Sequence, residues 1–522
     1  MTALPPSTRV LIAGGGPVGL ATAVELGRRG VHCVVIEPRE SVSRARPRCK
    51  TINVRTMEHL RRWGLADRLR ELAPLPVDWS QDIVFCTTLA GRELSRFTGV
   101  LGLADGGDRY PERGQQAPQY VLEELLRDTV AGLGPCTLAT GWSVASLDRK
   151  PDEVQVGVVD RAGRSTVVTA DYVVGADGPR SVVREQIGSA YVGEHALRPN
   201  FGMVFRAPDL WRHVAHGPAV QYWTVDPGAP GILGPLDRQG TWWFIAFGVD
   251  RETGSRDATQ LVHAATGTEC DVEILSTDPW TARMQRVDRL RAGRVFLAGD
   301  AAHLNPPFGG HGLNTGIGDA VDLGWKLAAH LDGWGGPALL DSYEAERGPL
   351  QDRVIAEATA NMQVLSTDLV GTDLDADGPA ADRARAALHS RIQQTKHAEF
   401  HALDLVLDTG YDGSPVLARH EEPCPDLLGH RLPHTWLGDG VSIYDRLGPE
   451  LTLLRLGGPG TAAHALLAAA DRRAVPLTVV DLADRGLRDR YGTDLVLVRP
   501  DQHVAWAGDE AAGDILDLVR GI

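Results

Sequence analysis

Residues 294–320 read RVFLAGDAAHLNPPFGGHGLNTGIGDA, and this stretch says more about the fold than any other part of the chain. A short apolar strand is predicted over 295–298, and it ends at Gly299 and Asp300. A turn rich in proline and glycine follows, and we expect a helix from about Thr315. Such a turn exposes backbone N–H groups at the start of a helix, where they attract anionic or electron-rich groups. Alone, the pattern fits any glycine-rich junction between a strand and a helix.

A second signal lies nearly 290 residues upstream. Residues 9–13 form an apolar, β-branched run, 18–29 have helical periodicity, and 31–36 form another apolar run that ends at Glu37. This order of strand, helix, strand and terminal acid predicts a βαβ unit of the dinucleotide-binding type. Glu37 could accept hydrogen bonds from ribose hydroxyls, or it could be a solvated acid at the end of a strand.

The first turn of this unit has the pattern GxGxxG, at Gly14, Gly16 and Gly19. These glycines allow a tight turn and the close approach of a pyrophosphate to the N–H groups of the helix. We place Pro17 and Val18 in the same binding turn. Two nucleotide signals at opposite ends of one domain predict FAD, held along its whole length.

The composition excludes several other classes of protein. The 522 residues carry a net charge of −15 and no basic stripe, which argues against nucleic acid as a partner. No stretch approaches the ~20 apolar residues of a membrane span, and no signal peptide is recognisable. The six cysteines are scattered without a CxxC pair, which fits a reducing cytoplasm. We therefore expect a cytoplasmic protein that binds neither a membrane nor a metal.

Three separated motifs resemble those of the single-component FAD-dependent aromatic hydroxylases, the group of p-hydroxybenzoate hydroxylase, phenol hydroxylase and the hydroxylases that tailor aromatic polyketides. The first is the GxGxxG turn, the second is GADGPRSVVR over 175–184, and the third is the stretch over 299–314. The resemblance implies an α/β fold: a Rossmann-like FAD-binding domain, an inserted antiparallel-sheet substrate domain and a C-terminal thioredoxin-like α/β domain.

The texture of the sequence and this resemblance together divide the chain into four parts. These parts are a discontinuous FAD-binding domain (1–75, 99–190 and 281–360), a substrate-binding β-sheet domain (76–98 and 191–280), a helical connector (361–400) and a thioredoxin-like domain (401–522). Within the FAD-binding domain we expect amphipathic helices over 51–70 and 118–131.

The resemblance assigns roles to residues of the third motif. Asp300 would accept hydrogen bonds from the ribitol hydroxyls, and Pro307 would lie against the flavin. The backbone N–H groups of Gly312, Leu313 and Asn314 would face the pyrimidine edge, where negative charge accumulates on reduction.

The resemblance also assigns roles outside the third motif. Arg48 would contact the flavin, Gln119 the pyrophosphate side, and Asp177 both FAD and NAD(P)H. Each has a plainer interpretation: Arg48 and Gln119 could be exposed, and Asp177 could serve a structural turn. His311 stands where relatives often have Gln, and it fits a solvated loop histidine better than a proton carrier.

The implied reaction has two halves. NADPH or NADH reduces the flavin, and O2 then adds at C4a to give a hydroperoxide that hydroxylates a phenolic or polycyclic aromatic substrate. Some group should deprotonate the phenol or stabilise its oxyanion, but the sequence does not identify it. Side chains of the expected sheet domain are candidates, each more often structural than catalytic: His195, His213, His216 and Tyr222.

Other outcomes stay open on the same fold. A Baeyer–Villiger or epoxidising oxygenase of an aromatic polyketide would use the same flavin chemistry. A flavin-dependent halogenase is less favoured, because the tryptophans over 241–246 depart from its motif, although Lys50 could be proposed as its lysine. A non-catalytic FAD-binding scaffold is a further alternative. The oligomeric state could be a monomer or a homodimer.

Overall fold

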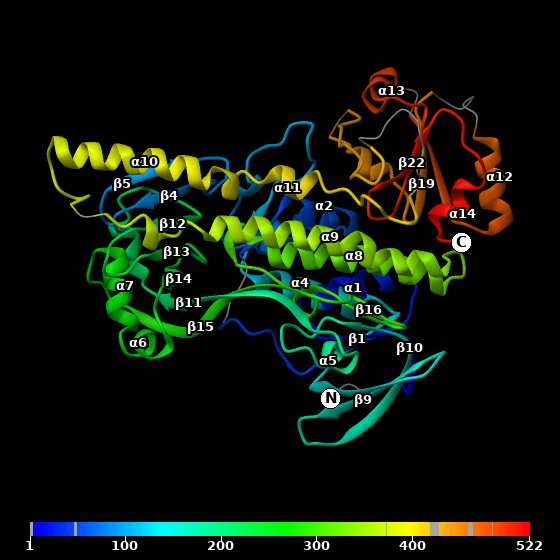
Figure 1. Cartoon of the computed structure of the whole chain (residues 1–522), viewed down its shortest axis with the longest axis horizontal. Coiled ribbons are helices and arrows are strands. Elements are labelled where there is room, and N and C mark those ends of the chain that lie inside the picture. The colour runs from blue at the N-terminus through cyan, green and yellow to red at the C-terminus, as the bar shows by residue number, and fades with distance from the viewer. Residues whose placement is uncertain are drawn as a thin grey trace.

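The computed structural model describes residues 4–45, 50–371, 373–417, 427–438, 440–457, 463–482 and 484–522. Three parts lie beside one another in Figure 1: a mainly parallel sheet with helices at the centre, a long, mainly antiparallel sheet at the left, and a small α/β module at the upper right. Within the described ranges, no helix has both the length and the apolar composition needed to cross a bilayer.

The first sheet is built on a core of parallel strands. Its central strands are buried along most of their length, as expected of a parallel sheet covered on both faces. Helices α1 (Pro17–Gly27), α4 (Gln119–Gly132) and α8 (His311–Leu331) pack around it, and α9 (Pro337–Met362) packs on α8. In spatial order the strands are β16 (Arg291–Ala292), β17 (Val295–Leu297), β10 (Ser165–Gly175), β1 (Ser7–Ala13), β2 (Cys33–Glu37) and β7 (Cys136–Thr140), with β9 (Val154–Asp160) and β8 (Trp142–Arg149) extending from β10.

The second sheet is mixed and has two different apolar faces. One face, with Tyr222, Trp242 and Phe244, packs against α7 (Ala258–Thr266), beside α6 (Arg251–Arg256). The other face, with Trp223 and neighbouring aromatic residues, packs against Phe308, the end of α9 and α10 (Pro379–Phe400). In spatial order the strands are β18 (His303–Leu304), β15 (Glu273–Val287), β11 (Tyr191–Arg206), β14 (Thr241–Phe247), β13 (Gly231–Pro235), β12 (Gln221–Thr224), β4 (Ile83–Cys86) and β5 (Glu93–Phe97).

The last part of the chain forms a four-stranded sheet with three helices. The long helix α10 (Pro379–Phe400) and the short α11 (Leu403–Leu407) lead to it across the rest of the molecule (Figure 1). The module contains β20 (Leu477–Asp481), β19 (Leu451–Arg455), β21 (Leu495–Val498) and β22 (Val504–Gly508), with α12 (His464–Arg473), α13 (Arg485–Tyr491) and α14 (Ile515–Val519).

The single helix expected over 51–70 is broken in the structure. Residues Thr51–Ile52 form strand β3, which pairs with β6 (Gln115–Gln116). Helix α2 (Val54–Trp63) then ends at Gly64, whose φ of +76° stops it, and α3 (Ala66–Leu72) follows. Propensity alone did not reveal the strand, because its partner lies more than 60 residues away.

Helix α8 begins at His311, four residues before the expected start near Thr315. Gly309 and Gly310 have φ values of +80° and +70°, which turn the chain sharply before the helix. The early start leaves the glycine-rich segment inside the first helical turn. The short helix α5 (Val182–Gln186) begins within the second motif.

Candidate cofactor and active site

Helices α1 and α8, which carry the two distant nucleotide signals, lie side by side and point the same way. A Cβ atom on Gly316 would lie 2.6 Å from Cγ2 of Val18, and one on Gly324 would lie 2.5 Å from Cβ of Glu25. Glycine therefore permits the close approach, and the contacts rise along both helices in the same order. Both positive helix ends consequently face the same side of the molecule.

The glycine-rich turn before α1 combines a tight backbone contact with open space. Gly14 has a φ of +102°, and a Cβ there would lie 2.3 Å from the carbonyl oxygen of Ala176. Gly16 is the N-cap of α1, which lacks a side-chain cap, and no atom lies within 4 Å of the place where its Cβ would be. The first N–H groups of α1 therefore face space that suits an anion such as pyrophosphate.

Glu37 at the end of β2 binds this turn directly. Its buried carboxylate accepts hydrogen bonds from the backbone N–H of Gly15, at 2.8 Å to Oε2, and from Arg39, at 2.7 Å from Nε to Oε1. The backbone N–H of Arg39 also donates to Oε1. Because a carboxylate has about four acceptor positions, Oε2 keeps capacity for one further donor, such as a ribose hydroxyl.

Gln119 lies at the first position of α4, close to the same group of charges. Its side chain hydrogen-bonds to Glu123, which also pairs with Arg39 at 2.9 Å. Burial raises the pKa of Glu123, and the neighbouring cations oppose that rise. Arg48, the remaining expected contact on this side, lies outside the described residues.

Asp177 in the second motif is engaged by its own turn. Its carboxylate accepts hydrogen bonds from Ser181 Oγ, at 2.5 Å, and from the backbone N–H of Val183, at 3.2 Å. Burial raises the pKa of Asp177, and these hydrogen bonds oppose the rise. The side chain thus stabilises the start of α5, and the residue is half-buried.

Asp300 is exposed at the end of β17, on a turn held from beneath by Asp319. The Asp319 carboxylate accepts from the backbone N–H of Gly299 at 3.1 Å, and it pairs with Arg347 and His303 at 2.8 Å each. Burial alone would raise the pKa of Asp319, but Arg347 and His303 outweigh it and hold the pKa at about 2. Asp319 was not expected at this site, although an acid within an apolar helix was a signal for a buried ion pair.

Asn314 joins the start of α8 to the segment around β3. Its Oδ1 accepts from the backbone N–H of Asn53 and from Thr56 Oγ1, at 3.0 and 2.8 Å. Its Nδ2 donates to the carbonyl oxygens of Thr51 and Gly310, at 3.0 and 2.7 Å. The side chain is fully used by the protein, so only its backbone N–H is available to a ligand.

The rest of this loop leaves backbone and apolar surface open. Pro307 is exposed, and Gly312 and Leu313 are partly exposed. His311 is buried, so the expectation of a solvated histidine was wrong: Gly309 packs so closely that a Cβ there would lie 2.3 Å from His311 Nε2. Burial lowers the pKa of His311 to about 4, which makes the ring neutral near pH 7.

The aromatic face of the second sheet meets this loop at Phe308. The Phe308 ring lies 6.0 Å from Phe247 and 6.3 Å from Trp223, measured between ring centroids. We call Trp223, Phe247, Phe308 and the neighbouring Trp243 the aromatic wall. Helix starts suited to a dinucleotide therefore adjoin a packed aromatic cluster, of which Trp243 alone is half-buried.

Comparisons with known proteins match this arrangement. Residues 7–358 match the family described as FAD binding domain, and residues 425–520 match the one described as aromatic-ring hydroxylase, C-terminal. The chain belongs to the FAD-dependent aromatic hydroxylases.

Individual relatives cover almost the whole chain. A putative polyketide hydroxylase of Streptomyces halstedii is 33% identical over 96% of this chain and 93% of its own. A 2,4-dichlorophenol 6-monooxygenase of Cupriavidus pinatubonensis is 31% identical over 100% and 97%. Among solved structures, K252c-soaked RebC superposes with a TM-score of 0.90 at 34% identity, over 100% of both chains. This hydroxylase is therefore a flavin-dependent monooxygenase with the fold expected from its sequence.

The candidates for phenol activation do not gather at the aromatic wall. Tyr222 points to the opposite face of the sheet, where its hydroxyl donates to the carbonyl oxygen of Gly217 at 2.5 Å and accepts from the N–H of Ala219 at 2.8 Å. His195 and His213 are exposed on the surface. The imidazole of the fourth candidate, His216, lies 3.5 Å from the carbonyl oxygen of Thr88, away from the wall residues.

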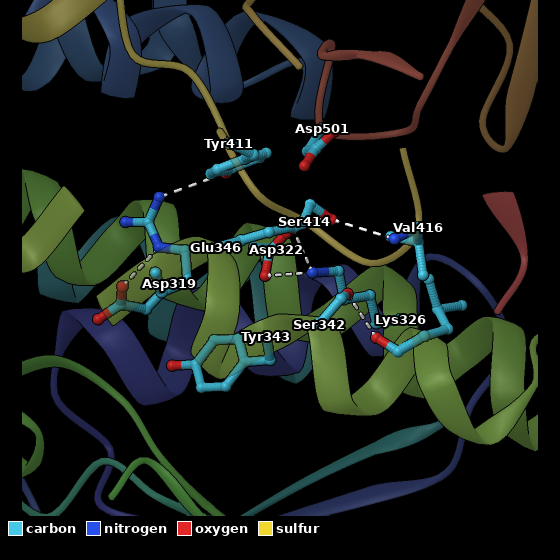
Figure 2. A network of polar contacts seen from close by, with 12 residues as sticks. Asp319, Asp322, Lys326, Ser342, Tyr343, Glu346, Tyr411, Ser414, Val416 and Asp501 are labelled. Carbon is cyan, nitrogen blue, oxygen red and sulfur yellow. Dashed lines mark hydrogen bonds and ion pairs between the residues drawn. The ribbon is translucent and has the colours of Figure 1, made fainter. Parts of the chain in front are cut away.

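A buried charge cluster fastens the C-terminal module of the hydroxylase to α8 and α9. Figure 2 shows Asp322, Lys326 and Glu346 on these helices, facing Ser414 and Asp501 from later segments. Arg499, just after β21, completes the cluster. Its guanidinium donates to Asp322 at 2.9 Å, to Glu346 at 2.7 Å and to Asp501 at 2.6 Å.

The charge cluster is continuous with the support of the Asp300 turn. Arg347, next to Glu346 on α9, pairs with Asp319 and contacts the hydroxyl of Tyr411 at 3.3 Å. No role for Arg499 was expected from the sequence. Two charges separated by one proline were a signal, but their partners lie more than 150 residues away.

Proposed function

We propose that this hydroxylase uses NADPH or NADH and O2 to hydroxylate a phenolic or polycyclic aromatic substrate. The observation that supports this most directly is the meeting of two parallel helix starts with the aromatic wall at Phe308. Relatives named for 2,4-dichlorophenol, and a solved complex of aklavinone-11 hydroxylase with FAD and aklavinone, fit substrates of this kind.

On this proposal the adenosine half of FAD lies along the first motif. The N–H groups after Gly16 would bind the pyrophosphate, and Glu37 would accept from the ribose through the free capacity of Oε2. Gln119 and Arg48 would complete this side. Asp177 would serve both FAD and NAD(P)H through its exposed part, without losing its hold on α5.

The flavin half would lie along the third motif. Asp300 is exposed where the ribitol would pass, and Pro307 is exposed where the ring would rest. The backbone N–H groups of Gly312, Leu313 and Asn314 lie in the first turn of α8, where intrahelical acceptors are missing. Their partial positive charge would stabilise the anionic reduced ring.

FAD, when bound, activates oxygen, and the protein orients the flavin and the substrate and keeps water away from them. The aromatic wall would hold the substrate ring near the flavin and exclude water from the reacting atoms. A cytoplasmic location fits Cys33, Cys86, Cys136 and Cys270, which are free thiols. We propose a monomer or a homodimer.

The proposal is tested by purifying the protein, reconstituting it with FAD and measuring NADPH and NADH consumption against a panel of phenols. We expect a yellow protein whose consumption rises with a phenol and yields a product heavier by one oxygen. NMR of that product separates ring hydroxylation from Baeyer–Villiger insertion or epoxidation. A protein that retains no flavin, or one whose consumption no phenol stimulates, would contradict the proposal.

A further inference from the structure

Lysine is rare in this chain, and its four copies differ in one respect. Three of them pair with carboxylates: Lys150 with Asp148 at 2.6 Å, Lys326 with Asp322 at 2.9 Å, and Lys396 with Glu399 at 2.7 Å. Lys50 is different, because its amine meets no carboxylate among the residues that the structure describes. A deeply placed amine without a counter-ion is costly for the fold, so its presence calls for a function.

Backbone carbonyl oxygens and an aromatic ring surround this amine. Nζ of Lys50 donates to the carbonyl oxygen of Val220, and that of Pro235 lies 3.4 Å away. The same atom lies 5.3 Å from the ring centre of Trp243. Burial lowers the pKa of Lys50 to about 7. The residue as a whole is half-buried, so Lys50 is not sealed inside the core of either sheet.

Lys50 lies between the loop that would hold the flavin and the aromatic wall. The next residue, Thr51, packs against Gly310 so closely that a Cβ on Gly310 would lie 2.8 Å from the Thr51 side chain. On the other side, the Lys50 amine stands over Trp243 of the aromatic wall. The indole N–H groups of Trp223 and Trp243 have no acceptor among the described residues.

We propose that Lys50 accepts the proton of the substrate's phenolic hydroxyl and then holds the resulting oxyanion, an inference that rests on the proposed function. The O–H bond of the phenol breaks, an N–H bond forms on Nζ, and the electron pair stays on the phenolate oxygen. No oxidant or reductant takes part in this step. The phenolate donates electron density to its ring, which makes a ring carbon a better nucleophile toward activated oxygen.

The charged groups on neighbouring elements leave this role to Lys50. On α4, Tyr120 stacks with Arg44, whose guanidinium lies 5.3 Å from the ring centre, and Asp237 after β13 interacts with Tyr120. None of these three side chains contributes to the lowered pKa of Lys50, which is caused by burial. An amine that is largely neutral near pH 8 can take a proton from a phenol, whose own pKa is about 10, and stabilise the pair by charge attraction.

The first test compares three variants of the FAD-loaded enzyme. Lys50→Met removes the amine at similar length, Lys50→Arg keeps a charge that cannot be neutralised, and Lys150→Met is a matched surface control. With the best phenol of the panel, we expect Lys50→Met to lower kcat about 100-fold or more and to retain FAD. Its activity should recover only as the pH rises toward the pKa of the free phenol. Lys50→Arg should recover part of the activity, and Lys150→Met should match the wild type.

A second readout does not depend on turnover. Lysines labelled with 13C at Cε give at most four NMR signals, and the Lys50→Met spectrum identifies the one from Lys50. At pH 8 we expect unsubstituted phenol, which is still protonated in solution at this pH, to move this signal toward its protonated position, whereas anisole, which has no acidic proton, leaves it in place. The other three signals should not respond.

The outcomes separate this inference from the proposed function. If no phenol stimulates the wild type, the proposed function itself fails. If the wild type hydroxylates a phenol but Lys50→Met keeps kcat within twofold and the same pH profile, only the role of Lys50 fails. A Lys50 signal that does not respond to phenol also overturns that role, and so does a product that carries chlorine only when both chloride and Lys50 are present.

Discussion

Gly14 and Gly16 lie two residues apart, yet they meet opposite surroundings. Gly14 has a positive φ and faces backbone at 2.3 Å, so its missing side chain is a requirement of the fold. Gly16 has an ordinary φ of −79° and faces open space, so the fold does not require glycine there. A pyrophosphate that fills this space would give the second glycine its reason.

Paired substitutions test this difference. Gly16→Val should leave the melting temperature of the FAD-free protein within a few degrees and raise the Kd for FAD at least about tenfold, because its methyl groups would occupy the space of the pyrophosphate. Gly14→Ala should destabilise the FAD-free protein itself, by about 1–3 kcal/mol from the backbone conformation alone. Thermal unfolding and quenching of FAD fluorescence measure both. Equal FAD affinity in Gly16→Val and wild type would contradict the assignment.

Asp300 gives a second prediction at the scale of one residue. Its side chain is exposed, so Asp300→Ala should change the stability of the FAD-free protein by no more than about 0.5 kcal/mol. If it binds ribitol hydroxyls, the same variant should lose FAD faster on dialysis, by about tenfold or more in Kd, because hydrogen bonds to charged groups contribute about 1.5–3 kcal/mol. Flavin retained after dialysis is the measurement. Retention equal to that of the wild type would refute the role.

At the scale of elements, the sequence predicted correctly those helices and strands that depend on neighbouring residues. The unit from β1 to Glu37 followed from apolar runs and glycine spacing, and it is present in the structure. The break in the helix expected over 51–70 did not follow, because β3 exists only through its pairing with β6. Distant partners also explain why Asp319 escaped notice. The roles of the site residues and the domain boundaries stay predictions.

Asp319 joins three elements, η3 (Gly299–Ala301), α8 and α9, so its loss should loosen them together. Asp319→Asn leaves Arg347 buried without its partner and should lower the free energy of unfolding by about 3–5 kcal/mol. Asp341, also on α9, is exposed and pairs with Arg291. Asp341→Asn is therefore the control and should change the free energy of unfolding by less than about 1 kcal/mol. Urea unfolding followed by circular dichroism measures both, and equal effects would contradict the account.

The same carboxylate predicts a pH dependence. The pKa of Asp319 is about 2 in the folded protein, below the value of about 3.9 in an unfolded chain. A lowered pKa stabilises the fold above the unfolded value, and this contribution of about 2–3 kcal/mol is lost as the pH falls from about 4 to about 2. Stability of the wild type should fall more steeply than that of Asp319→Asn in this window. Parallel curves from urea unfolding at several pH values would show that the carboxylate carries no such linkage.

At the scale of the whole molecule, the C-terminal module is fixed to the helices that would bind the flavin. Arg499 reaches α8 and α9 through Asp322 and Glu346, and α9 in turn supports the Asp300 turn through Arg347. These buried contacts of Arg499 attach the module to the two helices. The charges of this cluster do not cancel if every group is ionised, because it holds three acids (Asp322, Glu346 and Asp501) and two bases (Lys326 and Arg499).

The three acids of the cluster, Asp322, Glu346 and Asp501, should not be equivalent. Burial raises the pKa of Asp322 to about 8, whereas for Glu346 the attraction of Arg499 and Lys326 outweighs burial and lowers the pKa. Asp322 therefore carries the proton near pH 7, and an Asn resembles its neutral form. Asp322→Asn should change the free energy of unfolding by about 1 kcal/mol or less, while Glu346→Gln should lower it by about 3–5 kcal/mol.

The sign of the pH effect separates these two acids further. Because the folded pKa of Asp322 lies above its unfolded value, its contribution to stability is complete below about pH 4 and is lost as the pH rises through about 8. The wild type should therefore lose stability between pH 6 and pH 9, and Asp322→Asn should lose less. Urea unfolding at these two pH values, followed through tryptophan fluorescence, measures the difference. If Asp322→Asn were as unstable as Glu346→Gln at pH 6, Asp322 would be ionised, and the proton of the cluster would have to reside elsewhere.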